Sequence, residues 1–239
     1  GAWSAGQNAS VGGLSTPVRW SVSLASGQTI TGADQVYAIN TGFIWGTVRD
    51  AAGNPVYGVS VSASERKTGR STASVTTDRH GRYLLSVSAG LWQVGTSTAV
   101  PGHTPPAYQS VQVDAGETVG NVDLRYLPNL ATIVGAVRND SGAPLRSIPI
   151  YDYNQSRLSA PGQTTDAGGH YTLGVAPGFW TVLPNTGLIG HTTPGSRPLT
   201  VGPGVTATLD FTYTAATALI QGTVKDGAGT PIPGLWTND

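Results

Sequence analysis

The sequence predicts an all-β chain of tandem antiparallel β-sandwiches with a repeat of about 88 residues. Three observations predict this fold class. The chain has 33 glycines and 16 prolines among its 239 residues, and it has few of the residues that favour helices. Apolar residues alternate with polar ones, which is the period of a strand with one buried face. The same short motifs also recur at nearly constant spacing.

The first motif is a strand led by a glycine, and it occurs at Gly46, Gly135 and Gly222. Each copy is followed by a turn that contains a glycine and a proline, as at Gly53 and Pro55. Glycine supplies a positive φ and proline fixes a negative one, so this pair is typical of a tight turn. We therefore expect a strand and then a turn at the start of each copy.

Two further motifs keep the same frame. Thr-Thr-Asp followed by Gly-x-Tyr-x-Leu occurs at 76–85 and again at 164–173. A tryptophan two residues after a glycine then gives Trp3, Trp92 and Trp180, which are 89 and 88 residues apart. Repetition at such a period indicates repeated structural units rather than one large domain.

The frame divides the chain into four parts. Residues 1–41 are the C-terminal half of a repeat, and residues 42–130 form a complete sandwich. Residues 131–216 form a second complete sandwich, and residues 217–239 are the N-terminal strands of a further repeat. Both ends therefore fall within a copy.

Within a copy the alternation predicts about seven short strands in two packed sheets. Val59, Val61 and Ala63 share one face of a strand, and serines occupy the other face. The step from Asp78 to Gly81 is expected to join two strands in a tight hairpin.

The combined pattern resembles the carboxypeptidase regulatory-like domain family. The string G-x-V-x-D-x-x-G-x-P-V-x-G-V-x-V-x-A begins at Gly46, and T-x-x-D-x-x-G-x-Y-x-L and G-x-W-x-V follow it. Relatives of this family include collagen-adhesin B-type repeats and transthyretin-like, Ig-like sandwiches. The resemblance implies a non-catalytic module of the kind found in stalks, spacers, adhesins and enzyme appendages.

Several repeated residues are expected to support the fold. Burial of the recurring aromatic rings would stabilise each core, and the recurring aspartates would cap turns. The core and structural candidates are Trp3, Trp92, Trp180, Tyr83, Tyr171, Asp78 and Asp166.

No metal, cofactor or catalytic residue is expected. Calcium prefers clustered carboxylate and carbonyl oxygens, and the aspartates of this chain are scattered over separate turns. His103 and His191 share one position of the repeat, and neither has a second histidine at short spacing. The chain also lacks a nucleophile elbow, a zinc-protease motif and a phosphate-binding loop.

Three tryptophans lie outside the repeated positions and are candidate interface residues: Trp20, Trp45 and Trp236. Trp45 is expected to face outward on its strand. An outward tryptophan suits a contact with another copy or with a sugar ring, and packing between domains would explain it equally well.

The composition limits the partners. Charged residues make up 11% of the chain, and 13 basic residues balance 13 acidic ones. A nucleic-acid-binding protein would show a basic field, so none is expected. No apolar run approaches the roughly 18 residues of a membrane-spanning helix. The absence of cysteine excludes disulfides and thiolate sites.

These features favour an extracellular or cell-surface structural protein that forms a rod, stalk or filament. Its partners would be other copies or adjacent repeats, head to tail. If the partial copies belong to a complete subunit, neighbouring subunits would complete them by strand addition. The alternatives are a module that binds glycans or surface proteins, and an accessory segment of a large secreted hydrolase.

Overall fold

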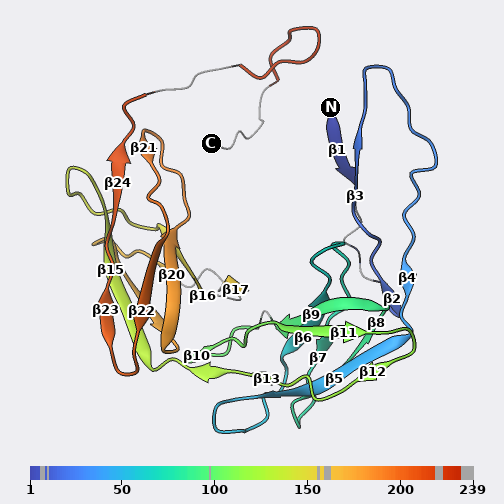
Figure 1. Cartoon of the computed structure of the whole chain (residues 1–239). Helices are drawn as coiled ribbons and strands as arrows, with labels where there is room; N and C mark the ends of the chain where they lie inside the picture. The colour runs from blue at the N-terminus through green and yellow to red at the C-terminus, as the bar shows by residue number, and fades with distance from the viewer. Residues whose placement is uncertain are drawn as a thin grey trace.

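The computed structural model describes residues 1–5, 9, 11–96, 98–154, 157–158, 163–218 and 223–232. These residues form 24 β-strands and no helix, so the predicted all-β class is confirmed. Nowhere in this part of the chain is there a helix that could span a membrane. Figure 1 shows two sandwiches and a separate N-terminal hairpin.

The first sandwich consists of two sheets. One sheet has the order β11-β9-β6-β7; in the other, β5 pairs antiparallel with β8 and parallel with β12 and β13. Its strands are β5 (Gly42–Arg49), β6 (Ser60–Ser64), β7 (Val75–Thr76), β8 (Arg82–Val87), β9 (Gly90–Thr96), β11 (Gln109–Val113), β12 (Thr118–Val119) and β13 (Leu124–Arg125).

The second sandwich repeats this plan. One sheet has the order β17-β16-β20-β22, with β18 also on β16; in the other, β15 pairs with β19, β23 and β24, and β21 pairs with β24. Its strands are β15 (Ala131–Asn139), β16 (Pro149–Asn154), β17 (Arg157–Leu158), β18 (Gln163–Thr164), β19 (His170–Val175), β20 (Gly178–Pro184), β21 (His191–Thr192), β22 (Arg197–Val201), β23 (Thr206–Thr208) and β24 (Phe211–Ala215).

Three small sheets complete the described structure. The N-terminal hairpin pairs β1 with β3, and two further pairs are β2 with β4 and β10 with β14. The strands are β1 (Ala2–Ala5), β2 (Leu14–Ser15), β3 (Trp20–Ser23), β4 (Ala38–Ile39), β10 (His103–Thr104) and β14 (Leu127–Pro128). The two short pairs lie at the ends of their copies, where one copy meets the next.

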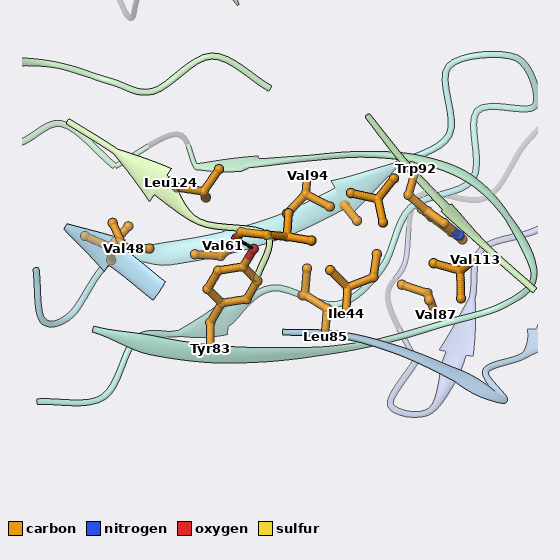
Figure 2. Packing of buried hydrophobic residues seen from close by; sticks show 14 of the residues in the cluster. Ile44, Val48, Val61, Tyr83, Leu85, Val87, Trp92, Val94, Val113 and Leu124 are labelled. Atoms are coloured by element: carbon orange, nitrogen blue, oxygen red, sulfur yellow. Dashed lines mark hydrogen bonds between the residues drawn. The ribbon is translucent and has the colours of Figure 1, made fainter. Parts of the chain in front are cut away.

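Each sandwich has its own apolar core. One buried cluster draws on residues 44–126 and the other on residues 131–213. Trp92 is fully buried and Trp180 is 3% exposed, and each indole donates a hydrogen bond to a backbone carbonyl four residues earlier. Figure 2 shows Trp92 at one end of the first core and Tyr83 near the other.

Trp3 does not lie in a core, contrary to the sequence prediction. Its side chain is 64% exposed. The local pairing is the expected one, because Trp3 faces Val22 across the hairpin as Trp92 faces Val111. The difference is that β1 pairs with β3 alone in the described residues, and no second sheet covers the ring.

The turn at Asp78 is also different from the prediction. The Gly81 amide donates to the Asp78 carbonyl, so the tight turn itself is present. However, β7 pairs with β6 while β8 pairs with β5. The turn therefore carries the chain from one sheet to the other, and it does not close a hairpin within one sheet.

The strand direction changes from one unit to the next. In Figure 1 the strands of the first sandwich run across the view, whereas β1 and β3 and the strands of the second sandwich run roughly vertically. Successive units are thus related by a bend and do not form a straight stack. The residues that fix this bend lie in the joints between units.

Candidate functional site: the joints between units

Joint 1 connects the N-terminal part to the first sandwich through Ser15 and Asn40. The Ser15 hydroxyl donates to Asn40 Oδ1 at 2.6 Å and accepts from the Ser88 amide at 3.4 Å. Asn40 Nδ2 donates to the Ser86 carbonyl at 2.8 Å. Ser15 is fully buried, so this relay is shielded from water.

Joint 2 repeats the relay between the two sandwiches. The Thr104 hydroxyl donates to Asn129 Oδ1 at 2.8 Å and accepts from the Ala176 amide at 2.8 Å. The Asn129 amide lies over Gly174, where an added Cβ would be 3.4 Å from Nδ2. Thr104 is 6% exposed. At both joints a hydroxyl that is paired with an asparagine therefore accepts a backbone amide of the next unit.

The short strand pairs place these side chains. Asn40 follows β4 and Asn129 follows β14, and their backbone amides donate to the carbonyls of Gly13 and Gly102. Both glycines have φ near +75°, at 75° and 72°, a region in which other residues are strained. The turn brings the hydroxyl strand beside the asparagine, so the two side chains bond to each other within the same unit.

The same backbone arrangement occurs a third time with a different side chain. The Ala216 amide donates to the Gly190 carbonyl, and Thr192 pairs with Thr214 as Thr104 pairs with Leu127. Thr192 supplies the hydroxyl, but Ala216 stands where the other two copies have asparagine. Both residues are exposed. This end of the second sandwich therefore carries only half of the relay.

Joint 1 has additional backbone contacts. Thr16 donates its amide to the Ser71 carbonyl at 3.1 Å, and its hydroxyl accepts from the Ser71 amide at 2.8 Å. The Arg19 amide donates to the Thr68 carbonyl at 3.1 Å. At joint 2 the residue in the Thr16 position is Pro105, which has no amide hydrogen to donate.

A second repeated device stiffens each sandwich. The Tyr83 hydroxyl donates to the Val122 carbonyl, and the Tyr171 hydroxyl donates to the Leu209 carbonyl. Gly46 and Gly135 make room for these carbonyls, since a Cβ on either glycine would overlap the carbonyl oxygen. Burial raises the pKa of both tyrosines well above the ordinary value, so both remain neutral donors.

The recurring aspartates cap turns through backbone hydrogen bonds. Asp78 Oδ1 accepts from the amides of His80 and Arg82, and Asp166 Oδ1 accepts from those of Gly168 and His170. These bonds favour the charged form, so the pKa of each carboxyl is below its usual value of 3.8. Within the described residues no group of three metal-ligating side chains occurs.

The tryptophans predicted at interfaces have different surroundings. Trp45 is 43% exposed and its indole lies against Gly120, so one side of the ring is covered. Trp20 is partly buried, and its Nε1 has no hydrogen-bond partner in the described structure. Trp236 lies outside the described residues. The structure does not bring Trp20 and Trp45 into one site by any hydrogen bond or strand pairing.

Sequence reasoning missed the four relay residues. The signal was present, because Ser15 and Thr104 are 89 residues apart and so are Asn40 and Asn129. That interval equals the one between Trp3 and Trp92. A polar pair that keeps the frame of the buried tryptophan would have indicated a structural role at the joint.

Residues 44–126 match the family model of the carboxypeptidase regulatory-like domain. The resemblance is confirmed for this segment. The matched segment coincides with the first core, because the buried cluster also runs from Ile44 to Tyr126. A search of curated proteins gave no significant match.

Three solved structures are similar to most of this chain at low sequence identity. The Bacillus anthracis TIE protein is 14% identical, with a TM-score of 0.35; the match covers 83% of this chain and 42% of that one. A streptococcal ancillary pilin is 12% identical, with a TM-score of 0.37 and coverages of 89% and 73%. The minor pilin GBS52 of Streptococcus agalactiae is 12% identical, with a TM-score of 0.38 and coverages of 77% and 100%.

Proposed function

We propose that the protein is a non-catalytic structural component of the cell surface or extracellular space, and that its units form an array with a fixed bend at each joint. The observation that carries this proposal is the hydroxyl paired with an asparagine, which accepts a backbone amide of the next unit at both joints 1 and 2. A binding or catalytic module needs no such repetition. An array needs each unit to be oriented by the one before it.

The short connection between the two sandwiches supports a rigid joint. Tyr126 is fully buried in the first core and Ala131 is buried in the second, so only four residues separate the two cores. The Tyr126 hydroxyl also donates to the Thr98 carbonyl. A linker this short leaves little conformational freedom. We accordingly propose the division into 1–41, 42–130, 131–216 and 217–239.

Small-angle X-ray scattering of the full chain tests the proposal. We expect the scattering curve of the wild type to fit one bent arrangement of units. The double variant Asn40→Ala, Asn129→Ala removes the asparagine of both relays and should require an ensemble with a wider range of maximum dimensions. Asn54→Ala is the matched control, because Asn54 bonds to Asp50 in an exposed turn away from the joints. A wild-type curve that fits only freely rotating units would contradict the proposal.

A second candidate function is assembly by strand addition. In the first sandwich β9 pairs with both β6 and β11, whereas its counterpart β1 pairs only with β3 in the described residues. An unpaired strand edge beside the exposed Trp3 is a template for a further strand. Sedimentation velocity over a range of concentrations would show self-association that Trp3→Ser weakens. A monomer at all concentrations would exclude this route for the chain.

A further inference from the structure

Four of the 13 basic residues of this neutral chain lie at joint 1. The turn between β6 and β7 contains Arg66, Lys67 and Arg70 within five residues. The turn is closed by backbone bonds, from the Glu65 amide to the Arg70 carbonyl and from the Gly69 amide to the Glu65 carbonyl, both 2.8 Å. The three basic residues are therefore carried on one short, closed turn.

A fourth cation comes from the other side of the joint. The Arg19 amide donates to the Thr68 carbonyl, and the Arg19 side chain runs along Gly69, where an added Cβ would lie 3.4 Å from Cδ. Arg19, Arg66 and Lys67 are exposed, and Arg70 is partly exposed. We call these four side chains the basic patch.

Acidic residues are scarce in the two segments that carry the patch. Glu65 is the only acidic residue in 64–72, and none occurs in 15–20. The Glu65 carboxylate accepts a hydrogen bond from the Thr68 hydroxyl. The two segments together contain four basic residues and one acidic residue, whereas the whole chain has 13 of each.

Joint 2 has no such patch in its sequence. Tyr108 stands in the position of Arg19, and residues 104–109 contain no cation. The segment 153–161, which corresponds to the basic turn, has Arg157 alone. The patch is therefore not required for a joint, because the relay forms at joint 2 without it.

We propose that the basic patch binds an acidic polysaccharide, through sulfate, phosphate or carboxylate groups spaced along the polymer. Guanidinium groups bind such oxyanions through paired N–H donors, and three of the four cations are arginines. The patch is compact and lies at a single joint, whereas a nucleic-acid site needs a basic face or stripe. Since Arg19 and the turn belong to opposite sides of joint 1, the bound polymer would also hold that joint closed.

Heparin, as a sulfated polysaccharide probe, tests the proposal with the full chain. We expect binding that weakens with salt, with a slope in log Kd of about 0.7 per neutralised charge, as for single-stranded polyanions. Four cations then give a loss of about 50-fold between about 50 and about 200 mM salt. Arg66→Gln, Lys67→Gln should weaken binding at least about tenfold at the lower salt and reduce the slope by about half. Arg19→Gln should weaken it less.

The matched control is Arg79→Gln, Arg82→Gln, which removes two exposed cations from the Asp78 turn of the same sandwich. This variant should bind heparin like the wild type. An equal loss in the control, the absence of salt-dependent binding, or tighter binding to duplex DNA of similar charge would each overturn the proposal. None of these cations belongs to the relay, so the result is independent of the scattering test of rigidity.

Discussion

Joints 1 and 2 share the hydroxyl paired with an asparagine and differ in the contacts added to that pair. Joint 1 adds backbone bonds from Thr16 and Arg19 to the β6–β7 turn. Joint 2 has Pro105 in the Thr16 position and cannot make the first of these. Conversely, the hydroxyl-to-amide bond is 3.4 Å at joint 1 and 2.8 Å at joint 2. The relay is thus the set of contacts that both joints have, and joint 2 has fewer other contacts to hold the next unit.

The largest expected effect is the unfolding of one sandwich when its core tryptophan is replaced. Trp92→Ala and Trp180→Ala should each lower the free energy of unfolding by about 3–5 kcal/mol, because each leaves a cavity in a closed core. Trp3→Ala should change it by less than about 0.5 kcal/mol, since Trp3 is exposed. Urea unfolding followed by circular dichroism measures all three.

The three variants also test whether equivalent positions in the sequence repeat are equally buried in the structure. Trp3, Trp92 and Trp180 hold the same position of the sequence frame. If Trp3→Ala were as destabilising as Trp92→Ala, the N-terminal hairpin would have a covered core in solution, and the described exposure of Trp3 would be wrong.

A smaller effect tests whether the bond from the buried tyrosine to a backbone carbonyl stabilises both sandwiches. Gly46→Ala and Gly135→Ala place a Cβ against the carbonyl that the buried tyrosine binds, so each should destabilise its sandwich by about 1–3 kcal/mol. Thermal unfolding measures the loss. Gly187→Ala serves as the steric control, because Gly187 is exposed, has no atom within 4 Å of an added Cβ and does not have a positive φ.

The joints themselves are compared by removing the two hydroxyls. Thr104→Val leaves the Ala176 amide without its partner and should destabilise joint 2 by about 1–3 kcal/mol. Ser15→Ala should have a smaller effect, because the bond to the Ser88 amide is longer and Thr16 adds other contacts. Hydrogen exchange should quicken at the Ala176 amide more than at Ser88. Equal acceleration would mean that the two joints are equivalent.

Much of the fold could be predicted from local pattern, and the joints could not. Alternation fixed the buried faces of strands such as β5 and β8, and the glycine–tryptophan motif placed Trp92 and Trp180 against their own sheets. Which strands pair is not a local property, so the Asp78 motif does not reveal that its turn crosses from one sheet to the other. The exposure of Trp3 depends on whether another sheet covers it. The relay joins residues 73 positions apart, such as Ser15 and Ser88, and a spacing alone does not say what a polar pair contacts.

The smallest expected effect is the loss of folding stability at low pH. The pKa values of Asp50 and Asp78 are lowered in the folded chain, the first mainly by a side-chain bond from Asn54 and the second mainly by the Arg82 amide. A lowered carboxyl pKa stabilises the fold above the ordinary value of 3.8, and this stabilisation is lost as the pH falls through the folded value. The second sandwich has Asp166, but Asn139 replaces the other aspartate.

The first sandwich should therefore lose more stability than the second between about pH 5 and pH 2. The difference is modest because all three carboxylates are exposed. Amide exchange in β5 and β15 over this range would report each sandwich separately. Asp50→Asn copies the side chain of Asn139 and should bring the acid response of the first sandwich closer to that of the second. If the variant left the two responses as far apart as before, the turn carboxylates would not be the origin of the difference, and the cores or the joints would have to account for it.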